Sequence, residues 1–124
     1  MLNKLFVVII FLVSNFFSIA QLHQITFQVD MTNEVISPNG VHIAGDFQSI
    51  AGLGGNWSPS STEIMDNNDD GIYSITVLIP ENTYEYKFIN GNAWGMDESP
   101  PAECTVGPNH NRSFSVSGSN FTLP

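Results

Sequence analysis

The sequence predicts the all-β class: one β-sandwich of about six to eight short antiparallel strands, preceded by an export signal. Three observations support this prediction. Apolar and polar residues alternate with a period of two in several short runs, turn-forming residues separate those runs, and no amphipathic helical segment of useful length is present. The length of 124 residues accommodates one domain behind a targeting segment.

The first twenty residues have the pattern of a secretory signal peptide. Lys4 precedes an uninterrupted apolar run at residues 5–13, and the segment ends in the small-x-small sequence Ser18-Ile19-Ala20. The alternative is an N-terminal membrane anchor, but this run is short compared with the ~20 apolar residues that cross a bilayer. We therefore expect a signal peptide at residues 1–20 and a domain at residues 21–124. The product is expected to be secreted or at the cell surface (periplasmic or extracellular), with no membrane attachment after cleavage.

The first two strands are predicted from the spacing of their apolar residues. In residues 25–31 the apolar side chains occupy every second position, and residues 41–45 continue the pattern. Consecutive side chains of a strand point to opposite faces, so one face is expected to be buried and the other hydrated. This parity places His42 on the hydrated face. The sequence Ser37-Pro38-Asn39-Gly40 between the two runs is typical of a turn.

The remaining strands follow the same rule. Residues 72–79 and 83–89 each have one apolar face, and Pro80-Glu81-Asn82 is expected to connect them by a turn. Residues 112–116 and a short run at residues 121–123 complete the set. Strands of this number and spacing indicate an immunoglobulin-like β-sandwich, although the cysteine–tryptophan–cysteine pattern of antibody domains is missing.

The charge of the chain excludes some partners. Twelve acidic and three basic residues give a formal net charge of −9. Binding to nucleic acid or to anionic lipid needs lysine and arginine to neutralise phosphates, so neither is an expected partner. Only 12% of the residues are charged, which means that most of the hydrated surface consists of uncharged polar side chains.

Two tryptophans and one lysine are the candidate functional residues. Trp57 lies in the long Gly/Ser-rich stretch 48–62, which we expect to be a functional or mobile loop, and Trp94 lies just past a strand. Lys87 has the opposite parity to Tyr84 and should point away from the core. A tryptophan in a loop either fills a core pocket or contacts a ligand, and both interpretations remain open from the spacing alone. Flat aromatic faces with hydrogen-bond donors beside them suit a sugar ring.

Around these residues the chain resembles a known family. It is similar to the starch- and glycogen-binding carbohydrate-binding modules: the starch-binding domains of amylases and glucoamylases, and the glycogen-binding domain of the AMP-activated kinase β subunit. Small secreted domains of Bacteroidetes-type bacteria have the same pattern. The matching segments are Gly45-Asp46-Phe47, Gly55-Asn56-Trp57-Ser58, Asp70-Gly71-Ile72-Tyr73, the strand from Ile79 through Tyr84-Glu85-Tyr86-Lys87-Phe88 to Ile89, Trp94, and Asn111-Arg112-Ser113-Phe114-Ser115-Val116.

The resemblance implies a non-catalytic domain that binds a polysaccharide, an α-glucan such as starch or glycogen. It implies that Trp57 and Trp94 form a stacking platform and that Lys87 and Asn111 hydrogen-bond sugar hydroxyls. No cofactor is implied. The alternatives are a structural or protein-interaction β-sandwich of a larger surface protein with no sugar binding, and an accessory domain of a larger hydrolase.

Catalytic and metal motifs are weak. No nucleophile motif and no convincing acid–base pair is present, so we do not expect an enzyme. Asp66, Asn68 and Asp70 match the first half of a calcium loop, but Val77 stands where the loop needs a glutamate. An acidic β-hairpin turn is the favoured interpretation and no metal site is predicted, with weak calcium binding at these three residues as the alternative.

Cys104 is the only cysteine, so no disulfide can form within the chain. It is either a small buried residue, a free thiol, or a thiol whose disulfide partner lies elsewhere. Domains of the resembled type usually continue into a short cysteine-containing tail. We therefore hypothesise that the partner of Cys104 lies downstream of Pro124, which the position of the natural stop codon would test.

Overall fold

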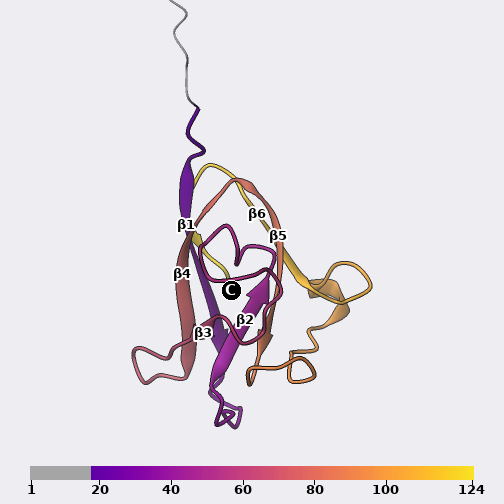
Figure 1. Cartoon of the computed structure of the whole chain (residues 1–124). Coiled ribbons are helices and arrows are strands. Elements are labelled where there is room, and N and C mark those ends of the chain that lie inside the picture. Colours follow the sequence, from indigo (N-terminus) through magenta and orange to yellow (C-terminus); the bar gives the residue numbers. More distant parts are fainter. Residues whose placement is uncertain (1–17) are drawn as a thin grey trace, which may run out of the picture.

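A computed structural model describes residues 18–124, and Figure 1 shows them as two β-sheets packed face to face. The all-β sandwich is therefore confirmed. The predicted signal peptide at residues 1–20 falls mostly outside the described residues and stays a prediction. Within residues 18–124 no helix has the length and apolar character needed to cross a membrane.

The two sheets divide the strands unevenly. One sheet has the order β4 (Ile72–Pro80), β1 (Leu22–Asp30), β7 (Phe121–Thr122). The other has the order β3 (Glu63–Ile64), β2 (Val41–Gly45), β5 (Asn82–Ile89), β6 (Arg112–Val116). Only β1 and β7 run parallel; the other neighbours are antiparallel. A short 3₁₀ helix, η1 (Ala102–Cys104), lies in the connection from β5 to β6.

An aromatic cluster joins the two sheets. Phe27 of β1 is fully buried and stacks on Phe47 with the ring centroids 4.6 Å apart. Edge-to-face contacts connect the same ring to Tyr86 at 4.9 Å and to Phe114 at 5.3 Å. Edge-to-face contact is one of the two arrangements that aromatic pairs favour, together with offset stacking. Because Tyr86 points into this core, the side chains next to it on β5 must point outward.

The strand boundaries differ from the prediction in two places. β1 begins at Leu22, earlier than expected, because its pairing with β4 continues to the register pair Leu22–Pro80. The two-residue strand β3 was not predicted, since two residues are too few to show an alternating pattern. After β3 the chain crosses to the other sheet. Met65 forms an isolated antiparallel bridge there with Ser74 of β4.

The predicted exposure of His42 is wrong. Its side chain does lie on the outer face of β2, as parity requires, but only 6% of its surface is exposed. Ala44 and Ile89, which share this face through the strand register, are fully buried as well. Other parts of the chain therefore cover this part of the outer face, which strand parity alone could not predict.

The acidic segment 66–71 forms a tight turn. The Asp66 carboxylate accepts hydrogen bonds from the backbone N–H groups of Asn68, Asp70 and Gly71 at 2.8–3.3 Å. These bonds lower the pKa of Asp66 below its ordinary value, the bond from Gly71 contributing most. Asp66 therefore has a structural role as the acceptor that closes the turn.

Cys104 is exposed at the end of η1. The interpretation as a small buried residue is therefore wrong. The 3₁₀ turn puts the thiol on the loop surface, where no core packing surrounds it.

Candidate functional site

Strand β5 supplies the base of the site. Its inward side chains Tyr84, Tyr86 and Phe88 are buried, and Glu85 and Lys87 lie on the opposite face. The predicted parity of Lys87 is confirmed. Only 14% of the Lys87 side chain is exposed, because loops stand on both sides of it.

Trp57 is held in an uncommon backbone conformation. Its φ of 56° lies in the left-handed region, which a bulky residue rarely adopts and which costs about 1–3 kcal/mol. The Trp57 N–H donates to the carbonyl of Gly45, at the end of β2. This bond ties the backbone of Trp57 to the end of β2 and offsets part of the backbone strain.

A buried glutamine organises the loop that carries Trp57. Gln48 is fully buried, and its Oε1 accepts from the N–H groups of Gly45 and Ser58 at 3.1 and 3.0 Å. Its Nε2 donates to the Ser58 carbonyl and to the Thr62 hydroxyl, both at 3.0 Å. Each polar atom of the amide thus has partners, and the loop is tied to β2 on both sides of Trp57.

Asp97 connects Lys87 to the loop that carries Trp94. Its Oδ2 accepts from Lys87 Nζ at 2.9 Å, and its Oδ1 accepts from the Gly95 N–H at 3.0 Å. The hydrogen bond from Lys87 is the main reason that the pKa of Asp97 lies below its ordinary value. One carboxylate therefore fixes both the lysine and the turn behind Trp94.

A short hairpin forms the wall opposite the tryptophans. Val106 and Asn111 pair through two backbone hydrogen bonds of 2.8 and 3.3 Å, with four residues at the tip. Asn111 is buried, and its Nδ2 donates to Glu85 Oε2 at 2.9 Å. This bond fixes the hairpin to the outer face of β5.

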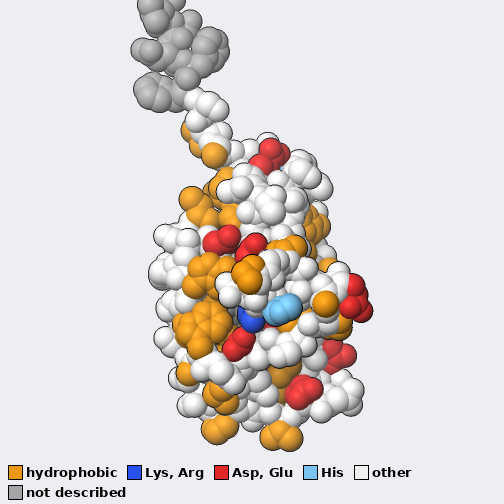
Figure 2. Space-filling model, turned by 90° about the vertical axis from the view of Figure 1, so that its right-hand side faces the viewer, with side chains coloured by type: hydrophobic (Ala, Val, Ile, Leu, Met, Phe, Trp, Pro, Cys, Tyr) orange, Lys and Arg blue, Asp and Glu red, His pale blue; other side chains and the backbone are white. Residues whose placement is uncertain are grey.

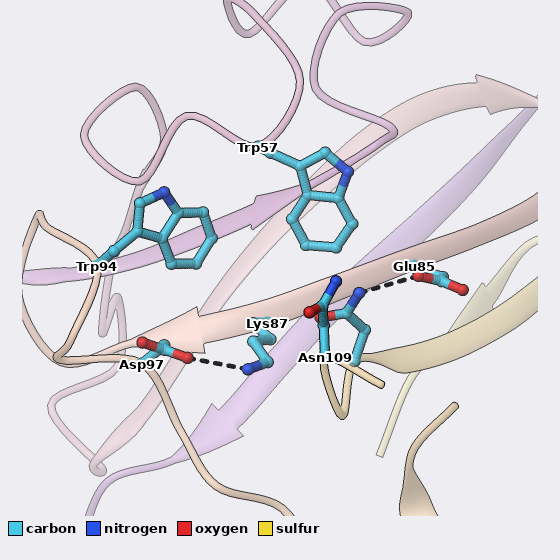
Figure 3. Close-up of a pocket in the computed structure, with 7 residues that line it drawn as sticks. Trp57, Glu85, Lys87, Trp94, Asp97 and Asn109 are labelled. Atoms are coloured by element: carbon cyan, nitrogen blue, oxygen red, sulfur yellow. Dashed lines mark hydrogen bonds and ion pairs between the residues drawn. The ribbon is translucent and has the colours of Figure 1, made fainter. Parts of the chain in front are cut away.

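The two tryptophans lie side by side above this floor (Figure 3). Their ring centroids are 6.4 Å apart and their planes are tilted by 40°. Trp94 is 46% exposed and Trp57 is half-buried, so neither belongs to the core. The rings open onto a pocket of about 460 Å³ that is also lined by Glu85, Lys87, Asp97, Asn109 and Asn111.

Both basic residues of residues 18–124 are paired with acids. Lys87 contacts Asp97, and Arg112 forms a two-pronged bond to Glu98 with both N–O distances at 2.8 Å. The hydrogen bonds to Glu98 raise the pKa of Arg112. Figure 2 shows the face on the side of β5 and β6, where basic atoms lie between a hydrophobic side chain, acidic atoms and a histidine. The positive charges are thus locally neutralised, which suits an uncharged ligand.

All four residues predicted for the site line the same pocket: Trp57, Lys87, Trp94 and Asn111. Sequence reasoning missed Glu85, Asp97 and Asn109. Glu85 shares the parity of Lys87 two positions away and could have been found from the alternation. Asp97 and Asn109 lie in irregular loops, where no periodic signal places a side chain. The three positions of the alternative calcium site, Asp66, Asn68 and Asp70, lie in a separate turn and do not line this pocket. Within residues 18–124, no group of three or more His, Cys, Asp or Glu side chains is arranged to hold a metal ion.

Residues 18–124 thus form a small β-sandwich with two tryptophans side by side at its surface. The family described as "Pullulanase X25 domain" matches residues 40–123. The chain belongs to the pullulanase X25 domain family, and the resemblance to modules of starch-degrading enzymes is confirmed.

Similar proteins are large amylolytic enzymes. The chain is 44% identical over 54 residues to the amylopullulanase of Thermoanaerobacterium thermosulfurigenes and 46% identical over 54 residues to that of Thermoanaerobacterium saccharolyticum. These matches cover 42% of this chain but only 3% and 4% of the relatives.

Among solved structures, the γ-cyclodextrin glucanotransferase of alkalophilic Bacillus clarkii has a TM-score of 0.56 and 25% identity, over 82% of this chain and 14% of that enzyme. The family 15 glucoamylase of Hypocrea jecorina shares the fold with a TM-score of 0.55 and 19% identity, over 83% of this chain and 16% of that enzyme.

Proposed function

We propose that the domain is a secreted, non-catalytic carbohydrate-binding module for α-glucan, which it binds through a platform formed by Trp57 and Trp94. One observation carries this proposal. Two tryptophans from loops 37 positions apart in sequence lie 6.4 Å from each other, partly exposed, at the mouth of one pocket. Packing alone does not account for two partly exposed tryptophans side by side, because exposed apolar patches mark sites where a ligand or partner binds.

The chemistry of the pocket fits a sugar chain. The C–H faces of pyranose rings stack on indoles, and the tilt of 40° between the rings suits a chain that curves. Around the platform, Lys87 and the asparagine amides offer donors, and the carboxylates of Glu85 and Asp97 offer acceptors for hydroxyls. We expect weak binding, because a hydrated sugar exchanges hydrogen bonds with water for hydrogen bonds with protein at small net gain.

The relatives support an accessory role. Amylopullulanase is the printed name of both curated relatives, and this chain matches a few per cent of their length. We infer that the domain works as part of a larger or multidomain system that acts on starch-like polymers, where it holds the polymer while another domain performs the chemistry.

Isothermal titration calorimetry and affinity electrophoresis with amylose and glycogen test the proposal. Trp57→Ala and Trp94→Ala should each weaken binding by about five-fold or more, because each removes an aromatic stacking contact of about 1 kcal/mol together with the apolar area that it buries. The matched control is Leu78→Ala, which removes an exposed apolar side chain from β4 and should leave binding unchanged. A wild-type domain that binds neither polymer would refute the proposal.

A further inference from the structure

A second pocket adjoins the platform pocket. It has a volume of about 310 Å³, and Lys87 and Asn109 line both pockets. Beyond these two residues it is lined by Ser99, Pro100 and His110, among others. The two hollows therefore adjoin at one wall residue from β5 and one from the hairpin.

The hairpin tip directs neighbouring side chains into the two hollows. Asn109 lines both, whereas His110 lines only the second. His110 has a φ of 50° in the left-handed region, and its N–H donates to the Gly107 carbonyl. The tip is thus a defined turn, and the buried Asn111 that follows is bonded to Glu85. The imidazole is therefore presented from an anchored element.

Like the first pocket, the second is lined by side chains that can form hydrogen bonds, but it contains no tryptophan. Ser99 has a hydroxyl, and the imidazole of His110 has two ring nitrogens that can form hydrogen bonds. Pro100 and Ala102 add small apolar surfaces. Glu98 also lines the pocket. Its carboxylate accepts hydrogen bonds from Arg112 and from the N–H of Phe88, so its charge is largely compensated. Such a surface suits the edge of an uncharged polyhydroxyl ring.

We propose that this second pocket is an extension subsite for the same glucan chain, which continues past Lys87 after leaving the tryptophan platform. The inference rests on the proposed function and adds that the domain distinguishes chain lengths. Two indoles stack about one sugar ring each, whereas the extended groove contacts further rings through His110 and Ser99. Short oligosaccharides should fill the platform only, and longer ones should gain affinity from the extension.

Calorimetric titration with maltose and with maltoheptaose tests this subsite. The key variant is His110→Gly, which deletes the imidazole and keeps a residue that tolerates the left-handed conformation. We expect about two- to ten-fold weaker binding of maltoheptaose, the range of one hydrogen bond, and unchanged binding of maltose. Ala102→Leu, which fills the pocket with a side chain that lacks donors, should have the same selective effect.

The matched control is Asp69→Gly, because Asp69 is also exposed and left-handed, with a φ of 56°, but lies in the distant turn at residues 66–71. It should bind both sugars like the wild type. Equal losses for maltose and maltoheptaose in His110→Gly would overturn the subsite proposal without refuting the proposed function. Unchanged binding of both sugars, in a His110→Gly variant with the wild-type melting temperature, would also overturn the subsite proposal. A wild-type domain that binds neither sugar nor the polymers would instead refute the proposed function, and the subsite with it.

Discussion

Single residues set the geometry of the platform through hydrogen bonds rather than through their own contact with a ligand. Asp97 is the clearest case, because its two oxygens bond to Lys87 and to the backbone of Gly95 beside Trp94. Lys87, which the sequence predicts to donate hydrogen bonds to sugar hydroxyls, thus already has one hydrogen-bond partner. Because Lys87 also lines the pocket, the bond to Asp97 fixes where its ammonium group lies.

Replacement of Asp97 should reveal this role through its pH dependence. The pKa of Asp97 is lowered in the folded state, so the pairing stabilises the domain above the ordinary aspartate pKa of 3.8 and is lost as the pH falls through the lower folded value. Asp97→Asn should lower stability by about 0.5–1 kcal/mol at pH 7, since the pair is only partly buried.

Thermal denaturation from pH 7 to pH 2 measures the effect. The difference between the wild type and Asp97→Asn should shrink toward zero at the acid end. The control is Glu103→Gln, an exposed acid in η1 that should change little at any pH. A stability difference that persists undiminished at the lowest pH would contradict the role of the ion pair.

Loops, not strands, determine what the outer face of the sheet can do. The strands were predictable because alternation is a local signal, and β2, β5 and β6 were found within a residue of their observed bounds. The loop after β2 has no such signal. Its glycines and serines predict mobility, yet a fully buried Gln48 bonds it to β2. Strand parity likewise mispredicted the exposure of His42, which is buried although its side chain lies on the outer face.

Gln48→Ala should loosen the whole loop. It leaves the buried N–H of Gly45 and the hydroxyl of Thr62 without this partner, which costs about 1–3 kcal/mol for each buried group left unsatisfied. We expect a clearly lower melting temperature and a shift in tryptophan fluorescence, because Trp57 would no longer be held in its left-handed conformation. Gln24→Ala is the matched control, since Gln24 is an exposed glutamine on β1. Equal melting temperatures for the two variants would contradict the role of Gln48.

At the scale of the whole molecule, one aromatic core supports the site. Phe27 contacts Phe47, Tyr86 and Phe114, which come from three different parts of the chain. Tyr86 lies between Glu85 and Lys87, so the core and the floor of the pocket are opposite faces of one strand. A domain of ~100 residues has a small stability margin, so loss of this core should also disorder the site.

Phe27→Ala should therefore destabilise the domain by about 3–5 kcal/mol and lower the melting temperature by about 15 °C or more. Phe27→Leu retains most of the apolar volume and should cost much less. Chemical denaturation followed by far-ultraviolet circular dichroism distinguishes the two. A similar midpoint for wild type and Phe27→Ala would show that the core is not organised around this ring.

The sequence by itself determined the sandwich, the strand parity that turns Lys87 outward, and the four residues Trp57, Lys87, Trp94 and Asn111 as candidates. These follow from alternation and from a local resemblance, which are both encoded in neighbouring residues. Only the tertiary structure decided that the two indoles are 6.4 Å apart, that Asp97 bonds Lys87, and that His110 opens a second hollow. The reason is physical: hydrogen bonds and ring contacts between distant loops depend on how the loops cross the finished sheet, and no periodic pattern records that crossing.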